Sequence, residues 1–118
     1  MVLIIIKVII IINIITLMKL TARRIKDKLS EVMDPELNIS IVDLGLIYQT
    51  KIIKNKIKIV MTLTTVGCPL IDMIQSEIIS KMIELGFKKN NIVIEVTFDP
   101  PWTMERMNRR GKAMLGIN

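Results

Sequence analysis

The residue best suited to chemistry in this chain is its single cysteine, Cys68, which lies in the segment TTVGCP, residues 64–69. A thiolate binds soft metal ions, and it can also act as a nucleophile. Pro69 suits the first position of a helix, which would make Cys68 the N-cap, where unpaired N–H groups and the helix dipole favour a thiolate. Gly67 allows a close turn there. A second reading stays open, in which Cys68 is a small, inert core residue.

Residue types that are missing or rare exclude several classes of chemistry. The chain of 118 residues contains no histidine and one cysteine. Histidine-based triads, zincins and imidazole acid-base catalysis are therefore excluded, as are an intrachain disulfide and a cysteine-rich zinc site. A lone cysteine without its usual base is not expected to make an independent enzyme. This cysteine usage fits a reducing, cytoplasmic setting.

Three short turns place an aspartate beside proline or near glycine. They are Asp34-Pro35-Glu36, Asp43-Leu44-Gly45 and Asp99-Pro100-Pro101-Trp102. In the simpler reading, each carboxylate accepts hydrogen bonds from nearby backbone N–H groups and the prolines stiffen the loops. In the functional interpretation, the loops dock a partner, or Asp99 or Asp43 supplies a secondary oxygen ligand if it comes near the thiolate. Trp102 is either an exposed contact residue or a plug over the core.

Positioning these residues requires regular elements, and hydrophobic periodicity predicts six of them. They are a helix at 22–33 with Thr21 as N-cap and Asp34-Pro35 as its stop, strands at 44–53 and 56–63 turning at Lys54-Asn55, a helix at 69–85 with Gly86 as C-cap, a strand at 92–98, and a helix at 104–115 capped by Thr103 and ending at Gly116.

The predicted order, α-β-β-α-β-α, indicates an α+β fold, a two-layer sandwich over a three-stranded mixed sheet. A polar loop is expected around residues 36–40, and an i,i+4 pair between Glu77 and Lys81. If strands 56–63 and 92–98 are parallel neighbours, the loops holding Cys68 and Asp99 open on the same edge of the sheet.

Residues 1–18 form a hydrophobic leader that differs from the rest of the chain. Fifteen of them are apolar, the exceptions being Lys7, Asn13 and Thr16. As a helix, residues 2–18 would be about 25 Å long, at the short end of a membrane span. Three origins stay open: a mistaken start upstream of Met18, a membrane anchor, or an added strand or targeting role. An anchor followed by basic residues would keep residues 19–118, an ordinary domain, facing the cytoplasm.

Three stretches, in order and spacing, resemble the SufT/PaaD-like metal-sulfur cluster biosynthesis family, whose eukaryotic relatives carry the MIP-type domain of cytosolic iron-sulfur assembly. They are DPELNISIVDLGLIY (34–48), MTLTTVGCPL (61–70) and VTFDPPWT (96–103). The family fold is the sandwich predicted above, similar to the C-terminal domain of NifU-type scaffolds and to KH domains. The resemblance covers about residues 22–117. It departs at Asn108-Arg109-Arg110-Gly111, where acidic and alanine-rich sequence is common.

The resemblance implies an accessory factor that assembles iron-sulfur clusters or transfers them to recipient proteins, with Cys68 as the thiol or metal site. The implied site residues are Cys68 with Thr64, Gly67 and Pro69, and the loop and docking residues Asp34, Pro35, Glu36, Asp43, Gly45, Asp99, Pro100, Pro101 and Trp102. One thiol cannot hold a cluster alone, because ordinary clusters take about four cysteine ligands. The cluster would be transient and shared with a second copy, a partner or small thiols.

Expected partners follow from the same resemblance. They are a P-loop cluster-carrier ATPase, recipient iron-sulfur proteins and a second copy in a homodimer. An adaptor that docks carriers or clients without touching the cluster stays the alternative. The basic final helix, with Arg106, Arg109, Arg110 and Lys112, is either a solvated face or a docking face for an acidic partner or RNA. RNA binding is not expected, because no two glycines are three apart and the GXXG loop of KH domains is absent.

Overall fold

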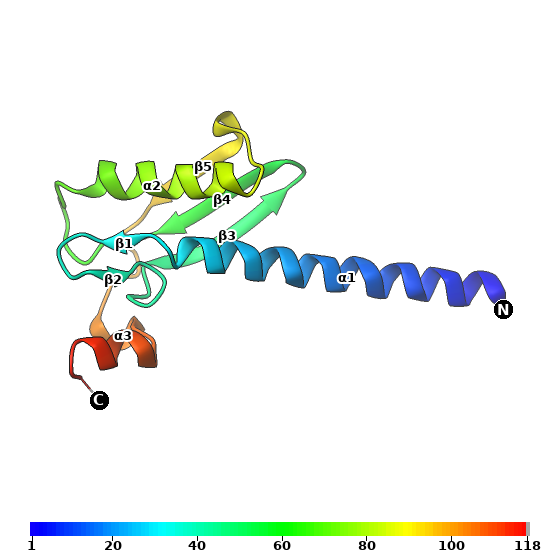
Figure 1. Cartoon of the computed structure of the whole chain (residues 1–118), viewed down its shortest axis with the longest axis horizontal. Helices are drawn as coiled ribbons and strands as arrows, with labels where there is room; N and C mark the ends of the chain where they lie inside the picture. Colours follow the sequence, from blue (N-terminus) through cyan, green and yellow to red (C-terminus); the bar gives the residue numbers. More distant parts are fainter. Residues whose placement is uncertain (118) are drawn as a thin grey trace.

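The computed structural model describes residues 1–117, except the side chains of residues 18–20. A small domain carries one long helix that projects away from it (Figure 1). The elements are α1 (Val2–Leu29), β1 (Met33–Asp34), β2 (Ile39–Ser40), β3 (Ile47–Ile53), β4 (Lys56–Met61), α2 (Ile71–Glu84), the 3-10 helix η1 (Lys89–Asn91), β5 (Ile92–Val96), the 3-10 helix η2 (Met104–Arg106) and α3 (Arg109–Met114).

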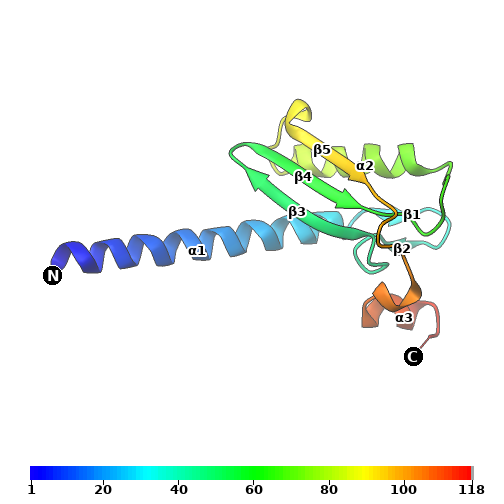
Figure 2. The same ribbon diagram turned by 180° about the vertical axis from the view of Figure 1, so that it is seen from behind.

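The main sheet has the order β3-β4-β5 and mixed strand directions, as predicted. β3 and β4 form an antiparallel hairpin, and its turn includes Lys54, whose φ is positive at 57°. β4 and β5 are parallel, with Ile57 opposite Ile92 and Met61 opposite Val96. The helix α2 makes the crossover that a parallel pair needs, and it lies behind the sheet in Figure 2.

The core lies between one face of this sheet and the helices α1 and α2. Along β4, Ile57, Ile59 and Met61 are buried, whereas Lys56 and Lys58 are exposed on the opposite face. This alternation is the period of two expected when one face of a strand is buried. Two layers therefore make up the domain, as the sequence predicted. The buried apolar residues are Ile25, Leu29, Val32, Ile39, Ile41, Leu44, Leu46, Ile57, Ile59, Met61, Leu63, Ile74, Ile78, Met82 and Met107.

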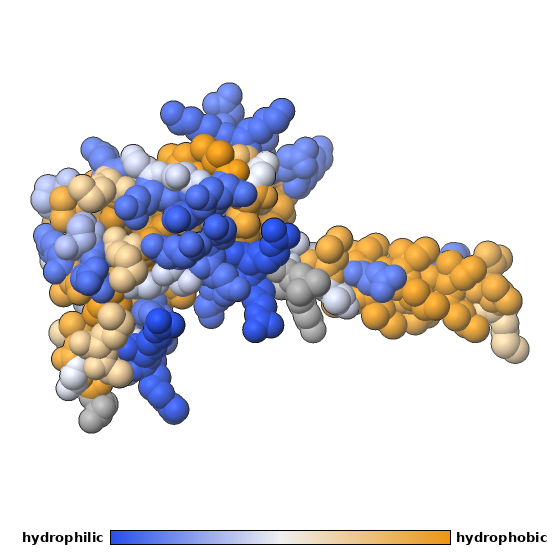
Figure 3. All heavy atoms as spheres, viewed as in Figure 1, coloured by the Kyte–Doolittle hydropathy of each residue, from blue (hydrophilic) through white to orange (hydrophobic). Residues whose placement is uncertain are grey.

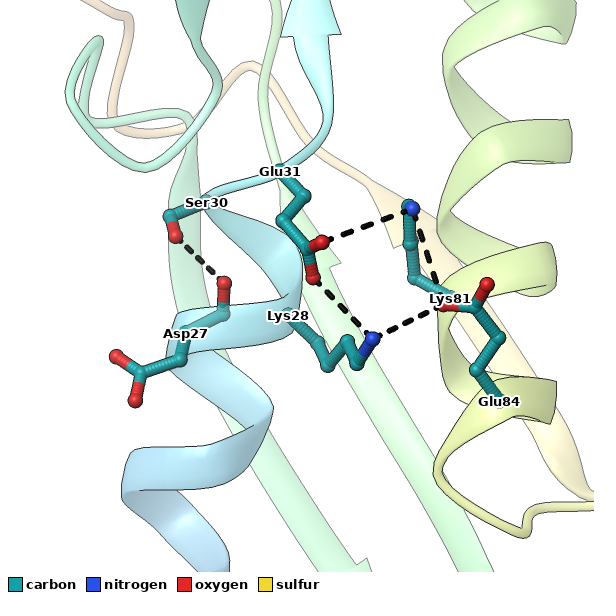
Figure 4. A network of polar contacts seen from close by, with 6 residues as sticks. All are labelled: Asp27, Lys28, Ser30, Glu31, Lys81 and Glu84. Atoms are coloured by element: carbon teal, nitrogen blue, oxygen red, sulfur yellow. Dashed lines mark hydrogen bonds and ion pairs between the residues drawn. The ribbon is translucent and has the colours of Figure 1, made fainter.

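A network of charged side chains joins α1 to α2 at the surface (Figure 4). The Lys28 Nζ atom lies 3.1 Å from Glu84 Oε2 and 3.4 Å from Glu31 Oε2, and Lys81 lies near both acidic groups. The hydrogen bond to Lys28 holds the pKa of Glu84 below its ordinary value, and the same bond raises the pKa of Lys28. The predicted pair with Glu77 is wrong, because Lys81 turns toward Glu31 and Glu84 instead.

The first helix differs from the prediction at both of its ends. Thr21 is not an N-cap, because α1 begins at Val2 and the Thr21 hydroxyl donates to the Leu17 carbonyl at 2.9 Å. Nothing between residues 2 and 29 is proline or glycine, so no residue stops the helix at the predicted start. The helix ends at Leu29, four residues before the predicted end, and Ser30 is its C-cap.

The projecting part of α1 is the hydrophobic rod in Figure 3. The apolar side chains from Val2 to Leu17 are 47–72% exposed, so none of them contributes to the core. Among the described residues, α1 is the one helix long and apolar enough to cross a membrane.

Two further regions depart from the prediction, because the elements in them are too short for periodicity to reveal. β1 and β2 form a two-stranded antiparallel ribbon, with Met33 opposite Ser40. β2 lies in the segment predicted as a polar loop, whereas β1 takes the last residue of the predicted helix and the first residue of its stop. The predicted helix at 104–115 is divided into η2 and α3, since Met107 has an extended backbone (φ −68°, ψ 141°). Thr103 makes no side-chain cap, and Asn108 caps α3 instead.

Candidate functional site

Two candidate loops leave the same edge of the sheet, as the sequence analysis expected for parallel neighbouring strands. Residues 62–70 follow β4 and residues 97–103 follow β5, and these strands are parallel neighbours. The pairing continues into the loops, because the Thr97 N–H donates to the Met61 carbonyl at 2.8 Å. The segments that carry Cys68 and Asp99 therefore start side by side, although no hydrogen bond described for the chain joins the two residues.

Cys68 lies before α2 rather than at its N-cap. The helix begins at Ile71, and its N-cap is Leu70, whose backbone is not helical (φ −96°, ψ 6°). Residues 69–70 form a turn, and the Ile71 N–H donates to the Cys68 carbonyl at 3.4 Å. The predicted N-cap position is therefore wrong, because the Pro69 turn separates the thiol from the helix N-terminus. The cysteine is partly buried and packs against the core.

The rest of the cysteine loop is open to solvent. Gly67 has a φ of +76°, which a residue with a side chain rarely adopts, and there is free space where its Cβ would be. Its role is therefore the direction of the chain rather than close packing. Val66 is 79% exposed and Thr64 is partly buried. Just before the loop, the Thr62 hydroxyl is fully buried and has no hydrogen-bond partner among the described residues.

Asp34-Pro35-Glu36 forms the turn of the short ribbon. The Asp34 carboxylate accepts hydrogen bonds from the N–H groups of Glu36 at 2.9 Å and Leu37 at 3.1 Å. Asp34 is buried, whereas Pro35 and Glu36 are exposed. The simpler reading of this motif is therefore what the structure shows for Asp34, since its carboxylate stabilises a turn.

Asp43 interacts with Asn108 and Arg110, at the start of α3. Its Oδ1 atom accepts a 2.7 Å hydrogen bond from the Asn108 amide, and its carbonyl accepts one from the Asn108 N–H at 3.1 Å. Oδ2 lies 3.7 Å from the Arg110 Nε atom. Gly111 is buried against the same residue, and a Cβ there would lie 2.6 Å from the Asp43 carbonyl oxygen. The carboxylate thus anchors α3 and is not a free oxygen ligand.

Gly45 and Trp102 make further contacts between the Asp43 turn and residues 102–111. A Cβ on Gly45 would collide with the Arg106 carbonyl, and its φ is +76°, so only glycine fits. The Trp102 indole donates to the Leu44 carbonyl at 2.6 Å, and its ring packs against the core. Trp102 is therefore the plug over the core rather than a freely exposed contact residue. Tyr48 donates to the Pro100 carbonyl at 2.8 Å.

The candidate residues thus fall into separate groups. Asp43, Gly45 and Trp102 meet at the C-terminal segment, whereas Cys68 lies in the cysteine loop and Asp34 in the ribbon turn. Asp99, Pro100 and Pro101 are exposed in the loop after β5. Within residues 1–117, no three cysteine, aspartate or glutamate side chains are grouped to hold a metal ion.

Sequence reasoning missed the residues that lock the C-terminal segment. Arg106 lies over the Tyr48 ring, 4.6 Å from its centroid, and Asn108 accepts the Gly111 N–H at 2.8 Å while its amide donates to Asp43. The basic final helix is in part a structural element, because Arg106 and Arg110 both contact the domain. The preference of asparagine for the N-cap would have indicated Asn108. No local pattern would have indicated its distant partner.

Comparison with known proteins gives a consistent match. A family model described as iron-sulfur cluster assembly protein matches residues 22–94. The Fe-S protein maturation auxiliary factor YitW of Bacillus subtilis is 40% identical over 90 residues, which are 75% of this chain and 87% of that protein. The Fe-S protein maturation auxiliary factor SufT of Staphylococcus aureus is 35% identical over 88 residues, which are 74% of this chain and 99% of that protein.

Solved structures agree with the fold. A domain of unknown function from Bacillus anthracis superposes with a TM-score of 0.74 at 37% identity, over 81% of this chain and 92% of that one. A conserved hypothetical protein of Thermotoga maritima gives a TM-score of 0.67 at 38% identity, over 80% of this chain and 93% of that one.

Proposed function

The chain belongs to the iron-sulfur cluster assembly protein family, and on this premise we propose that it is a non-catalytic accessory factor in the maturation of iron-sulfur proteins. The proposed action is to hold a cluster briefly at Cys68 and pass it to a recipient protein. The relatives at 40% and 35% identity are named Fe-S protein maturation auxiliary factors, which supports the accessory role. The cluster is the cargo in this proposal and not a resident cofactor.

The observation that carries the proposal is the setting of Cys68. It is the single thiol of the chain, it is partly buried, and it sits in an exposed loop whose direction is set by the positive φ of Gly67. Thiolate is the ligand that iron-sulfur clusters take in proteins. A thiol at the edge of a loop can be reached by a second protein, whereas a thiol in the middle of the core cannot.

Ligand counting makes the site a shared one. Clusters ordinarily take about four cysteine ligands, and this chain supplies one. The remaining ligands would come from a second copy of the chain, from a P-loop cluster-carrier ATPase, from the recipient protein or from small thiols. We propose that handover occurs by ligand exchange, in which thiolates of the recipient replace those of the donor without a change in cluster charge.

Anaerobic reconstitution of the full chain in mild detergent tests the direct role of Cys68. Iron and sulfide in the presence of a small thiol should produce a visible chromophore that is labile to chelators. Measured on the protein after small molecules are removed by gel filtration, this chromophore should be abolished by Cys68→Ala, because the chain has no other cysteine. Val66→Ala is the matched control, since Val66 is exposed in the same loop and carries no ligand atom. Equal absorbance of Cys68→Ala and the unchanged protein would eliminate direct ligation.

The alternative is an adaptor that binds carriers or clients without touching the cluster. The observation that favours it is the exposure of two apolar side chains in the neighbouring loops, Val66 at 79% and Phe98 at 38%. Capture of a purified P-loop cluster carrier should then survive Cys68→Ala and fail with Val66→Asp. Loss of capture with Cys68→Ala, and retention with Val66→Asp, would reject the adaptor. Trp102→Ala is unsuitable for this test, because Trp102 packs on the core.

A further inference from the structure

The projecting half of α1 is apolar, and the end of the domain next to it is basic. We propose that residues 2–18 insert into an anionic lipid bilayer, that the basic end of the domain faces the lipid headgroups, and that the Cys68 loop points away from the membrane. We define the basic end as α1 residues 21–26, the β3–β4 turn and residues 86–91. This inference is independent of what Cys68 binds.

Lipid fits this helix because the helix is apolar on all sides. Its three polar residues are Lys7, Asn13 and Thr16, and at 3.6 residues per turn Lys7 and Thr16 lie about 180° apart. The helix therefore has no polar face, unlike helices that lie in the membrane plane and unlike soluble coiled coils. The apolar side chains are 47–72% exposed, which is far more contiguous apolar surface than a soluble monomer carries.

The length and the position of Lys7 agree with insertion. Residues 2–18 are about 25 Å long as a helix, against a hydrocarbon core of about 30 Å, a difference that a bilayer accommodates by local thinning. Lys7 lies five residues after Val2, which places it about 7.5 Å from the N-terminal end of the helix. A lysine side chain at this depth can extend to the far headgroups.

Positive charge gathers where α1 leaves the domain. One hollow is lined by Thr21, Lys54, Asn55, Lys88 and Asn91, so the helix, the β3–β4 turn and the segment after α2 meet there. On α1, the exposed residues Arg23, Arg24 and Lys26 come shortly after Thr21. Lys56 and Lys89 directly follow two of the lining residues, Asn55 and Lys88, in the sequence. Residues 51–58 and 86–92 contain no acidic residue. A basic surface beside a membrane-spanning helix complements anionic headgroups.

The fold then sets the direction of the cysteine loop. β4 runs from Lys56 near the basic end to Met61, about 17 Å at the usual rise per strand residue. The loop with Cys68 follows its far end, and Figure 1 shows the β3–β4 turn and the start of α2 at opposite ends of the domain. The positive charge next to the span predicts that this side is cytoplasmic.

Flotation tests the insertion. The full chain in detergent is reconstituted with phosphatidylcholine vesicles containing phosphatidylserine and centrifuged through a density gradient. We expect it to float with the vesicles after washing with carbonate and with high salt. Recovery in the vesicle-free fractions as oligomers would overturn the proposal, because a second copy would then cover the apolar helix. A native chain that lacks residues 1–17, read by mass spectrometry of its N-terminal peptide, would overturn it equally.

Quenching tests the orientation. A fluorophore on Cys68 should not be quenched by a nitroxide attached to lipid headgroups. The same fluorophore on the Cys68→Ser, Lys88→Cys variant should be quenched strongly. Equal quenching at both positions would show that the domain lies otherwise. Partly folded variants are recognised by circular dichroism and set aside in favour of Lys89→Cys, which tests the same surface.

Charge neutralisation tests the lipid class. In competition between vesicles with and without phosphatidylserine, each lysine removed from the basic end should lower the preference for the anionic vesicles about fivefold. The tested substitutions are Lys54→Gln, Lys88→Gln and Lys89→Gln. Arg109→Gln, an exposed cation of α3, is the matched control and should leave the preference unchanged. Equal effects of the control and of the three substitutions would overturn the proposed contact.

Discussion

Gly111→Ala is expected to destabilise the protein, although helix propensity alone predicts the opposite. In an exposed helix, replacing glycine by alanine gains about 1 kcal/mol. Here the added Cβ would lie 2.6 Å from the Asp43 carbonyl oxygen and 3.2 Å from Met107 Cε. The first of these atoms belongs to the backbone, so either α3 or the Asp43 turn must move.

Movement of α3 weakens the two hydrogen bonds that Asn108 makes with Asp43, at 2.7 Å and 3.1 Å. The bond to the carboxylate is worth about 1.5–3 kcal/mol and the bond to the carbonyl about 1 kcal/mol. If both bonds are lost, the net cost after the propensity gain is subtracted is about 1.5–3 kcal/mol. For a domain of this size, this corresponds to a fall in Tm on the order of 10 °C.

The assay is urea or thermal unfolding of the full chain in mild detergent, followed by circular dichroism. Ala113→Gly is the matched control, because Ala113 is exposed in the same helix and its change should cost about 1 kcal/mol at most. A Gly111→Ala protein that is more stable than the unchanged chain would refute the reasoning. It would mean that α3 does not rest on the Asp43 turn.

Three further predictions follow from single contacts. Thr62→Val should stabilise the protein by about 1–2 kcal/mol in chemical denaturation, because it removes a buried hydroxyl that has no hydrogen-bond partner in the described part of the chain. Trp102→Phe should cost about 1 kcal/mol in the same assay, since it keeps a ring but loses the bond to the Leu44 carbonyl. The lowered pKa of Glu84 stabilises the fold above the ordinary carboxyl pKa, and this contribution should be lost as the pH falls through the lowered value. Glu84→Gln removes the charged partner of Lys28, so the free energy of unfolding of this variant should fall less steeply as the pH is lowered through the acid range.

Each of these predictions has a contrasting variant. Thr97→Val should destabilise, because the Thr97 hydroxyl makes hydrogen bonds within its turn. A loss of stability in Thr62→Val as large as in Thr97→Val would show that the buried hydroxyl is satisfied. Trp102→Ala should cost more than Trp102→Phe, because the ring covers the core. Glu77→Gln should leave the acid pH dependence of the free energy of unfolding unchanged. If it reduces that dependence as much as Glu84→Gln does, Lys28 and Glu84 are not paired.

The sheet and its helices could be predicted from the sequence because their periodicity is local. Ile57 and Ile59 alternate with lysines in β4, and Ile74, Ile78 and Met82 recur at helical spacing in α2. The loops after β4 and β5 were expected to share an edge if these strands are parallel neighbours, and their parallel pairing meets that condition. Periodicity therefore gave the architecture but not the details of its loops.

What could not be predicted depends on contacts between distant residues. Gly111 reads as a weak point in a helix, yet it allows α3 to lie on the Asp43 carbonyl. From the sequence, Trp102 could be either a surface contact or a plug over the core. Its hydrogen bond to the Leu44 carbonyl shows that it covers the core. The position of Cys68 relative to α2 could not be predicted either, because a proline at residue 69 does not specify that Leu70 is non-helical and that α2 begins only at Ile71. The proposed roles of Cys68 and of the exposed Asp99 loop stay predictions.

The unbroken course of α1 also has a mechanical consequence. A flexible linker lets an attached domain explore a volume that grows with linker length, whereas a helix transmits the attitude of one end to the other. From residue 19 to Leu29, where the helix ends, is about 16 Å. With no proline or glycine in the whole helix, there is no built-in hinge along this distance. Anything fixed to the first half of α1 would thus set the height and tilt at which the domain, and with it the cysteine loop, is held.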